Sequence, residues 1–347
     1  MRKTLLLGAI FALTLSTLAQ ESITLNALWQ RYEFYAGGIS GLRSMNDGAH
    51  YTTQGKGTIE QYSYETGKQV GIVLDVTALN SEAAEVPTFD AYALSDDESW
   101  AILKTETTKI YRRSSASVVW LVDLQSHEAR KLRPEKVRYA TFSPDGAFVA
   151  YVLENDLFVY DIQSAAHNRI TNDGAFNRII NGATDWVYEE EFGFVRAFDW
   201  SQDSNQIVYM RFDETKVPIF SMDIYGKDVY QFPYRFRYPK AGEENSKITL
   251  HHFTVENRKK KRISFEGEVP YYIPRIKFEE GNNGLIIQTL NRHQNHLKVW
   301  RWIPKTGKMQ LLLEEKDEAY VSIHDNLQFL EDATFLWTSE RDGYNHV

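Results

Sequence analysis

A short unit of a turn and its flanking strands recurs along this chain and restricts the folds open to it. Its clearest copy is the turn Ser143-Pro144-Asp145-Gly146, which lies between the strand-like runs 140–142 and 147–152. Proline presets the backbone at the second position of a type I turn, and glycine suits the last position. Weaker copies begin at Asn46, Ser95, Ser201, Glu279 and Glu331.

The spacing of these copies predicts the architecture. Successive starting points are separated by 49, 48, 58, 78 and 52 residues, a period of roughly 50 with insertions. A four-stranded blade of a β-propeller has this period, and the aromatic content of 14% also favours strands. We therefore predict an all-β propeller of four-stranded blades over residues 41–347, with about six repeats visible. A β-sandwich is the alternative, but it does not explain a unit that returns at this interval.

The longest interval between copies holds an insertion at about 225–252, which is rich in Tyr, Phe, Pro and charged residues. Two interpretations of it stay open. It is either an arm that leaves its blade and forms an interaction surface, or an ordinary packed loop. The last repeat is cut short at Val347. Because a propeller closes on itself to protect its sheet edges, we expect the propeller in this chain to be incomplete.

The first 19 residues have the pattern of a secretory signal. Arg2 and Lys3 precede a short apolar run, and residues 17–19 form a small-residue cleavage site that leaves Gln20 or Glu21 as the new N-terminus. The run is too short to span a bilayer comfortably, so we expect no membrane span after cleavage. A retained signal anchor is the alternative.

Residues 20–40 follow as a separate N-terminal segment with a short predicted helix. Apolar residues recur there at helical spacing, and Ser22 or Thr24 is the candidate N-cap. The chain has no cysteine, whereas exported eukaryotic proteins of this size usually carry disulfides. We therefore expect a bacterial protein that is periplasmic or secreted. A net charge of −8 argues against nucleic acid as a partner.

Three consecutive carboxylates among aromatic residues give the strongest functional signal. Like charges that lie close repel, and apolar neighbours strengthen the repulsion by lowering the local dielectric. The run either caps a short helix, or it binds a primary ammonium through carboxylates and aromatic faces. One acidic run supplies too few ligands to predict a metal site. The acidic residues of this segment and their aromatic neighbours are Asp185, Trp186, Tyr188, Glu189, Glu190 and Glu191.

A second candidate is the run 111–115, in which Arg112 and Arg113 precede a strand. Adjacent arginines there can hold a carbonyl or carboxylate in fork geometry, or they can simply mark a solvated strand end. The sequence contains no Gly-x-Ser-x-Gly elbow, no phosphate loop and no His-Glu-x-x-His motif. We therefore predict no catalytic residue, no metal and no cofactor in this chain.

Taken together, these segments resemble the dipeptidyl peptidase IV family of serine peptidases. The run 181–191 is similar to that family's glutamate motif. The segments 41–48, 111–115, 217–218 and 238–242 fall in the family's order, so the resemblance covers nearly all of the chain after the signal.

This resemblance implies an N-terminal eight-bladed propeller followed by an α/β-hydrolase domain, with substrate entering between them. The hydrolase domain and its Ser, Asp and His are absent from this chain, so we expect the chain alone to be inactive. The complete protein is expected to be an exopeptidase that releases Xaa-Pro or Xaa-Ala dipeptides from peptides with a free N-terminus.

The resemblance also implies roles for particular residues. Glu190 and Glu191 would hold the substrate's α-ammonium group, and Arg112 would contact a substrate carbonyl and orient the glutamates. Glu189, with Asp185, Trp186 and Tyr188, is expected to support the site. The arm that contains 238–242 would help to form a homodimer.

Two other functions stay open. The first is a non-catalytic periplasmic propeller that acts as a binding or interaction module, which only the sequence beyond Val347 would separate from the peptidase. The second is a related peptidase that cuts longer or blocked peptides, which the glutamate motif disfavours.

Overall fold

The computed structural model describes residues 23–347, except 37, 40, 80–84, 266, 268, 280–283 and 331–333. The signal expected at residues 1–19, the candidate cap Ser22 and the starting point Glu331 therefore lie outside the described residues. The chain divides into two compact units, residues 1–42 and residues 43–347, and each is described by itself.

The described part of the first unit contains the short helix α2 (Leu25–Trp29). Its N-cap is Thr24, whose hydroxyl accepts a hydrogen bond from the backbone N–H of Ala27 at 3.0 Å. The short N-terminal helix is thus confirmed, with one of its two candidate caps. Leu25 and Trp29 on this helix are exposed.

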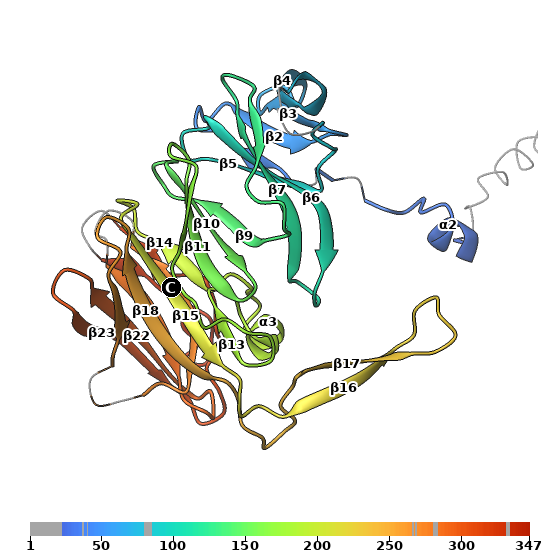
Figure 1. Cartoon of the computed structure of the whole chain (residues 1–347). Helices are drawn as coiled ribbons and strands as arrows, with labels where there is room; N and C mark the ends of the chain where they lie inside the picture. Colours follow the sequence, from blue (N-terminus) through green and yellow to red (C-terminus); the bar gives the residue numbers. More distant parts are fainter. Residues whose placement is uncertain are drawn as a thin grey trace, which may run out of the picture. The chain divides into compact units, whose positions relative to one another are not determined.

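The second unit is a series of antiparallel sheets, one for each repeat in the sequence (Figure 1). The first sheet has β1 (Arg43–Ser44), β2 (His50–Gln54), β3 (Thr58–Ser63) and β4 (Gln69–Asp75), followed by the 3-10 turn η1 (Val76–Ala78). The second has β5 (Ala91–Leu94), β6 (Trp100–Lys109), β7 (Ser115–Asp123) and β8 (Ala129–Lys131). The third has β9 (Arg138–Phe142), β10 (Phe148–Leu153), β11 (Asp156–Asp161) and β12 (Ala166–Arg169).

The fourth sheet is larger and carries the only α-helix of the unit's described residues. It comprises β13 (Ile179–Asn181), β14 (Phe198–Trp200), β15 (Gln206–Asp213), β18 (Lys247–Thr254) and β19 (Lys260–Ile263), with helix α3 (Trp186–Glu191) between β13 and β14. The fifth sheet has β20 (Tyr272–Phe278), β21 (Leu285–Leu290), β22 (His296–Ile303) and β23 (Lys308–Lys316). A two-stranded piece, β24 (Gln328–Phe329) and β25 (Phe335–Leu336), follows.

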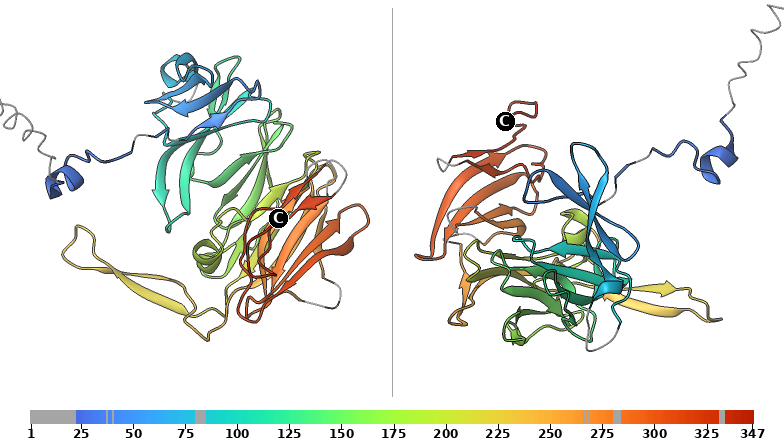
Figure 2. Two further views of the ribbon diagram at one scale, coloured as in Figure 1. Left: turned by 180° about the vertical axis from the view of Figure 1, so that it is seen from behind. Right: turned by 90° about the horizontal axis from the view of Figure 1, so that it is seen from above.

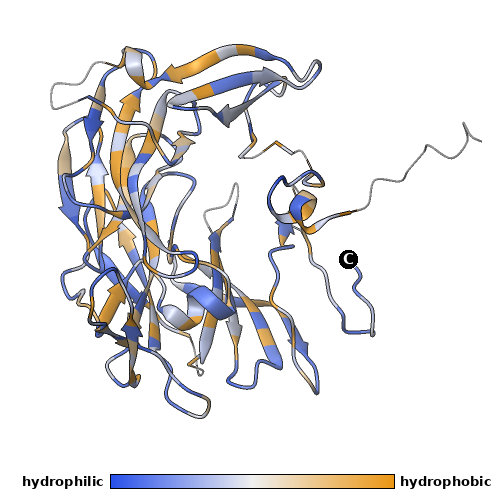
Figure 3. Cartoon of the chain, turned by 90° about the vertical axis from the view of Figure 1, so that its right-hand side faces the viewer, coloured by the Kyte–Doolittle hydropathy of each residue, from blue (hydrophilic) through white to orange (hydrophobic). Residues whose placement is uncertain are grey.

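Consecutive sheets are neighbours in space. Residue contacts join β7 to β9, β11 to β13 and β14 to β20, and Figure 2 shows the same order from two further sides. The buried cores lie between sheets, since Leu121 of β7 packs in one cluster with Val149 and Tyr151 of β10. Figure 3 shows apolar residues concentrated in the strands and polar residues in the turns. The predicted all-β, propeller-like architecture is confirmed.

The recurring turn is closed by the same hydrogen bonds in three repeats. In each, a buried serine hydroxyl donates to the aspartate two residues later and accepts from a backbone N–H five residues later. The serine thereby closes the turn from inside, which is why the pattern survives where the proline is missing. Gly146 has φ of +70°, a conformation that favours glycine. The serines are Ser95, Ser143 and Ser201.

The insertion is a projecting hairpin, which we call the arm: β16 (Ile219–Ile224) pairs with β17 (Phe232–Arg237) and with no other strand among the described residues (Figure 1). It begins before the expected 225–252, and residues 247–252 belong to β18. The difference arises because β18 pairs with β15 over eight residues and buries Leu250 and Phe253. This pairing and the two buried side chains make the strand part of the blade.

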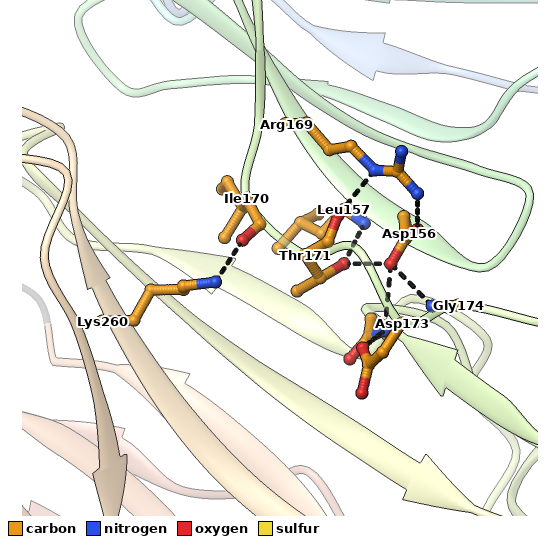
Figure 4. A network of polar contacts seen from close by, with 9 residues as sticks. Asp156, Leu157, Arg169, Ile170, Thr171, Asp173, Gly174 and Lys260 are labelled. Atoms are coloured by element: carbon orange, nitrogen blue, oxygen red, sulfur yellow. Dashed lines mark hydrogen bonds and ion pairs between the residues drawn. The ribbon is translucent and has the colours of Figure 1, made fainter.

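A buried polar network fixes the crossover that leads from the third sheet to α3 (Figure 4). Asp156 is 1% exposed, and its carboxylate accepts from the Thr171 hydroxyl at 2.6 Å, the Gly174 N–H at 3.0 Å and the Asn181 amide at 3.2 Å. Arg169 pairs with the other oxygen at 2.5 Å. Because buried polar groups are costly unless they are paired, this network holds residues 169–181 in one course.

Two carboxyl groups are buried where the fourth sheet meets α3. Asp185 is 5% exposed and Glu214 is 6% exposed. Burial raises the pKa of Asp185, although hydrogen bonds from the Ser246 hydroxyl and the Tyr188 N–H oppose the rise. Burial, assisted by the charge of Asp185, raises the pKa of Glu214 from 4.5 to about 7.

Glu214 should therefore make the stability of the chain depend on pH. Below pH 4.5 the group is protonated in both states. As the pH rises towards 7, the unfolded state ionises first, so folding loses about 3 kcal/mol in total. We expect Glu214→Gln to remove this loss. The free energy of unfolding measured in urea, variant minus wild type, should therefore rise by about 2–3 kcal/mol between pH 5 and pH 8.

The control is Glu256→Gln, which neutralises an exposed carboxylate on the turn between β18 and β19 and should keep the wild-type pH dependence. An advantage of Glu214→Gln that stays constant across this pH range would contradict the account.

Candidate functional site

Helix α3 is short but firmly held. Asp185 is its N-cap and accepts from the Tyr188 N–H at 3.0 Å. Tyr188 is 1% exposed, and its hydroxyl accepts from the Ile273 N–H at 2.9 Å. Its ring packs edge-on against Phe192 and Phe212, and burial raises the pKa of its hydroxyl. These contacts anchor one face of the helix in the core, and the glutamates project from its other sides.

The three glutamates of α3 lie in three different environments, which resolves the repulsion that their sequence suggests. Glu189 is buried, Glu190 is largely shielded with 17% of its side chain exposed, and Glu191 is exposed. Each of the first two contacts the loop 110–114, which joins β6 to β7 in the second sheet.

Glu189 contacts the backbone of that loop. One of its carboxylate oxygens accepts from the N–H of Arg113 at 2.6 Å and from the N–H of Ser114 at 2.8 Å. Two successive backbone N–H groups that point at one anion form a concave anion-binding arrangement, and hydrogen bonds to an ionised acceptor are about twice as strong as neutral ones. The buried carboxylate is thereby hydrogen-bonded to the backbone, and the guanidinium of Arg138 lies close enough to interact with its charge.

Glu190 contacts a side chain of the same loop. The Nε of Arg112 lies 2.9 Å from one carboxylate oxygen and 3.2 Å from the other. Because the Arg112 side chain is 72% exposed, solvent screens this pair, and it contributes less than about 1 kcal/mol to stability. An ion pair that contributes so little to folding is free to serve recognition.

Arg112 and Glu190 stand on the wall of an open groove of about 880 Å³, beside the aromatic face of the arm. Trp186 also lines the groove, and its ring centre lies 4.4 Å from that of Tyr238. Glu191 is not among the lining residues. The arm contributes Phe220, Met222, Ile224, Phe232, Tyr234 and Phe236, the chain just after it contributes Tyr238 and Lys240, and the loop contributes Ile110 and Tyr111.

The structure thus sorts the residues singled out from the sequence. It brings Arg112, Glu190 and Trp186 to one groove, and it places Asp185 and Tyr188 beneath them as cap and anchor. Tyr111 belongs to the run 111–115 that the sequence analysis named. The lining residues that sequence reasoning missed are Ile110 and the aromatic residues of the arm. The alternation of aromatic residues in 232–238 was the available signal, because alternate residues of a strand share one face.

A second cavity of about 690 Å³ adjoins the groove and shares Ile110, Tyr111 and Trp186 with it. Its walls include the charged residues Glu214 and Arg237. Burial raises the pKa of Tyr111, which therefore lies between the two spaces as a neutral phenol.

Chemically, the groove combines a shielded carboxylate, a guanidinium and aromatic faces. A carboxylate and aromatic rings complement a compact organic cation, and a guanidinium with unused N–H groups complements a carbonyl oxygen. Among the described residues, no group of three or more His, Asp or Glu side chains is arranged to hold a metal ion. In the same part of the chain, no helix has the length and apolar character needed to cross a bilayer.

Known proteins share this fold and sequence. The crystal structure of Porphyromonas gingivalis dipeptidyl peptidase 4 matches with a TM-score of 0.86 and 34% identity, over 94% of this chain and 47% of that one. Prolyl endopeptidase FAP of Bos taurus is 27% identical over 355 residues, 93% of this chain and 43% of its own length. Dipeptidyl peptidase 4 of Sus scrofa is 34% identical over 172 residues, 48% of this chain and 22% of its own length.

This chain therefore spans less than half the length of each of these relatives. The family model described as "Dipeptidyl peptidase IV (DPP IV) N-terminal region" matches residues 95–347, which is most of the chain and includes both the loop 110–114 and α3. With the sheets and the glutamate helix in place, the match is conclusive: this chain belongs to the dipeptidyl peptidase IV N-terminal region family.

Proposed function

We propose that this chain selects the substrate in a serine dipeptidyl peptidase that releases Xaa-Pro or Xaa-Ala dipeptides. The observation that carries the proposal is the pair of Arg112 and Glu190 on the wall of the aromatic groove. The catalytic Ser, Asp and His would belong to a hydrolase domain of the complete protein, so the chain alone should hydrolyse nothing.

In this proposal Glu190 binds the α-ammonium group of the peptide. The ammonium offers three N–H donors, and a carboxylate with 17% of its side chain exposed makes stronger charge-assisted bonds than a fully solvated one. Glu191, exposed at the end of the same helix, is proposed as the second carboxylate. Arg112 is oriented by Glu190 and keeps guanidinium N–H groups free for a carbonyl of the peptide.

A fixed ammonium site explains how such an enzyme would cut at a set number of residues from the N-terminus. If the N-terminus is held at one point, only the bond at a set distance along the extended peptide reaches the nucleophile, which is a positioning effect. A peptide with a blocked N-terminus would displace water from the carboxylate of Glu190 and bring no cation in return. Only the exposed Arg112 side chain would then pair with it, which is costly. The site therefore favours free N-termini over blocked ones.

We expect Glu190→Ala and Glu191→Ala, each in the complete protein, to lower kcat/KM for an Xaa-Pro-nitroanilide on the order of a hundredfold. The reason is the loss of a carboxylate that pairs with the ammonium. Steady-state kinetics measure the effect, and Glu256→Ala, which removes an exposed carboxylate elsewhere, is the control. An unchanged kcat/KM in both α3 variants would refute the ammonium assignment.

The runner-up is a non-catalytic propeller that serves as a binding module. It requires that the complete gene product lack a Gly-x-Ser-x-Gly nucleophile elbow and any activity on Xaa-Pro-nitroanilides. We also propose export to the bacterial periplasm or medium. The signal pattern of residues 1–19 and the absence of cysteine support this location.

The partners that we propose are peptides with a free N-terminus and a second copy of this chain, bound through the arm. The tip of the arm exposes large side chains that serve no core: Val229 is 94% exposed, Tyr230 82% and Tyr225 79%. Exposed apolar side chains gathered on a projecting hairpin are typical of an interaction surface. A twofold dimer would bury the same surface on both copies.

We expect Val229→Asp to turn the dimer of the complete protein into a monomer, because an uncompensated charge would be buried at the contact. Light scattering coupled to size-exclusion chromatography gives the mass directly. The matched control is Val269→Asp, which places the same charge on a valine that is 84% exposed outside the arm. A monomeric wild type, or a Val229→Asp variant that remains dimeric, would rule out dimerisation through the arm.

A further inference from the structure

We infer that Glu189, the first glutamate of the triplet, is a positioning residue that holds the loop 110–114 against α3 so that Arg112 meets Glu190. The inference rests on the proposed function, since it assigns a role within the same site. It gives Glu189 no contact with the substrate.

The burial of Glu189 shows that its charge belongs to the protein interior. Glu189 is 1% exposed, and Ser114, one of its two hydrogen-bond partners, is 3% exposed. Both groups that donate to it are backbone N–H groups, those of Arg113 and Ser114. The contact therefore fixes the path of the loop and does not depend on where the Arg113 side chain points.

The loop itself is tight enough to transmit this constraint. The N–H of Ile110 donates to the carbonyl of Ser114 at 2.9 Å, and the N–H of Tyr111 donates to the Ser114 hydroxyl at 3.1 Å. Arg112 lies at the tip between these closures. Once Glu189 fixes the backbone of the next two residues, the backbone of Arg112 has little freedom left.

The ion pair of Arg112 and Glu190 is too weak to do this unaided. The Arg112 side chain is 72% exposed, so water screens the pair and ordering a long side chain opposes it. The bonds of Glu189 are buried and charge-assisted, and losing them would leave two N–H groups without partners in a dry environment. Of the two contacts between the loop and α3, the buried one therefore determines the geometry.

The two elements come from different sheets. The loop joins β6 to β7 in the second sheet, whereas α3 leaves β13 in the fourth, and Glu189 lies 76 and 75 residues from its two partners along the chain. The third sheet separates them in sequence, so no local turn sets their distance. The contact of Glu189 therefore sets the distance between the guanidinium of Arg112 and the carboxylate of Glu190.

The experiment uses three Glu189 variants of the complete protein. Glu189→Gln keeps the length and a carbonyl acceptor, Glu189→Asp keeps the charge but is too short to span the same contact, and Glu189→Ala removes both. We expect Ala and Asp to lower kcat/KM for Gly-Pro-nitroanilide by about tenfold to a hundredfold, mostly through KM, because a shift of about 1 Å is enough for such a loss. Gln should recover most of it.

Two further measurements separate positioning from a general loss of structure. The preference for Gly-Pro-nitroanilide over its N-acetylated form should fall in the Ala and Asp variants, since only the free ammonium uses the site. In a background of Arg112→Ala, adding Glu189→Ala should change KM little, because Glu189 acts through Arg112.

The control is Glu279→Ala. Glu279 is an equally buried carboxylate, 3% exposed, which pairs with Arg301 at 2.7 Å in the fifth sheet. Its loss should lower the thermal unfolding midpoint and leave KM and the substrate preference unchanged.

The outcomes are distinguishable. An inactive wild type, or a wild-type kcat/KM in both Glu190→Ala and Glu191→Ala, would reject the proposed function and this inference with it. An active enzyme in which Glu189→Asp keeps the wild-type KM, or in which Glu279→Ala raises KM as much, would reject the inference alone. Losses that multiply fully in the double variant of Arg112 and Glu189 would also reject it. Should Glu189→Ala fail to fold, the comparison of Asp with Gln decides the question.

Discussion

The contact between the Glu189 carboxylate and the backbone of the loop 110–114 is the interaction on which the rest of the site depends. It joins elements of the second and fourth sheets that are 75 residues or more apart in sequence. Hydrogen bonds within each sheet hold its strands together, but they do not determine how a loop of one sheet meets a helix of another. The buried carboxylate of Glu189 and its two backbone donors set how the loop 110–114 meets α3, since another arrangement leaves a charge or two N–H groups unpaired.

This contact also explains how three adjacent carboxylates coexist on one short helix. Two backbone N–H groups and the nearby guanidinium of Arg138 satisfy the charge of Glu189, so Arg112 is left to pair with Glu190. Glu191 points to solvent, where its charge is inexpensive. The groove beside them is lined by the aromatic face of the arm, so a ligand that enters meets charge on one wall and rings on the other. The division of roles among identical residues comes from burial and not from residue type.

Much of this could be predicted from the sequence, because the relevant signals are local. The turns centred on Ser95, Ser143 and Ser201 are closed by the serine and aspartate that the pattern contains. A helix cap at the start of the acidic run and a contact of Arg112 with the glutamates were expected from the run and from the family resemblance. The structure gives Asp185 as the cap. The partners of Glu189 could not be predicted, since backbone N–H groups leave no signature in sequence. The expected end of the insertion was wrong because the strand pairing of β18, and not its composition, decides where the blade resumes.

The central claim is that α3 and the loop 110–114 together form a receptor for a peptide N-terminus. A crystal structure of the complete protein with a bound Xaa-Pro dipeptide tests it most directly. The account predicts the α-ammonium nitrogen within about 3 Å of a Glu190 carboxylate oxygen, a peptide carbonyl within hydrogen-bond distance of Arg112, and Glu189 still bonded to the backbone of Arg113 and Ser114. A dipeptide whose ammonium lies elsewhere, with the pair of Arg112 and Glu190 untouched, would contradict it.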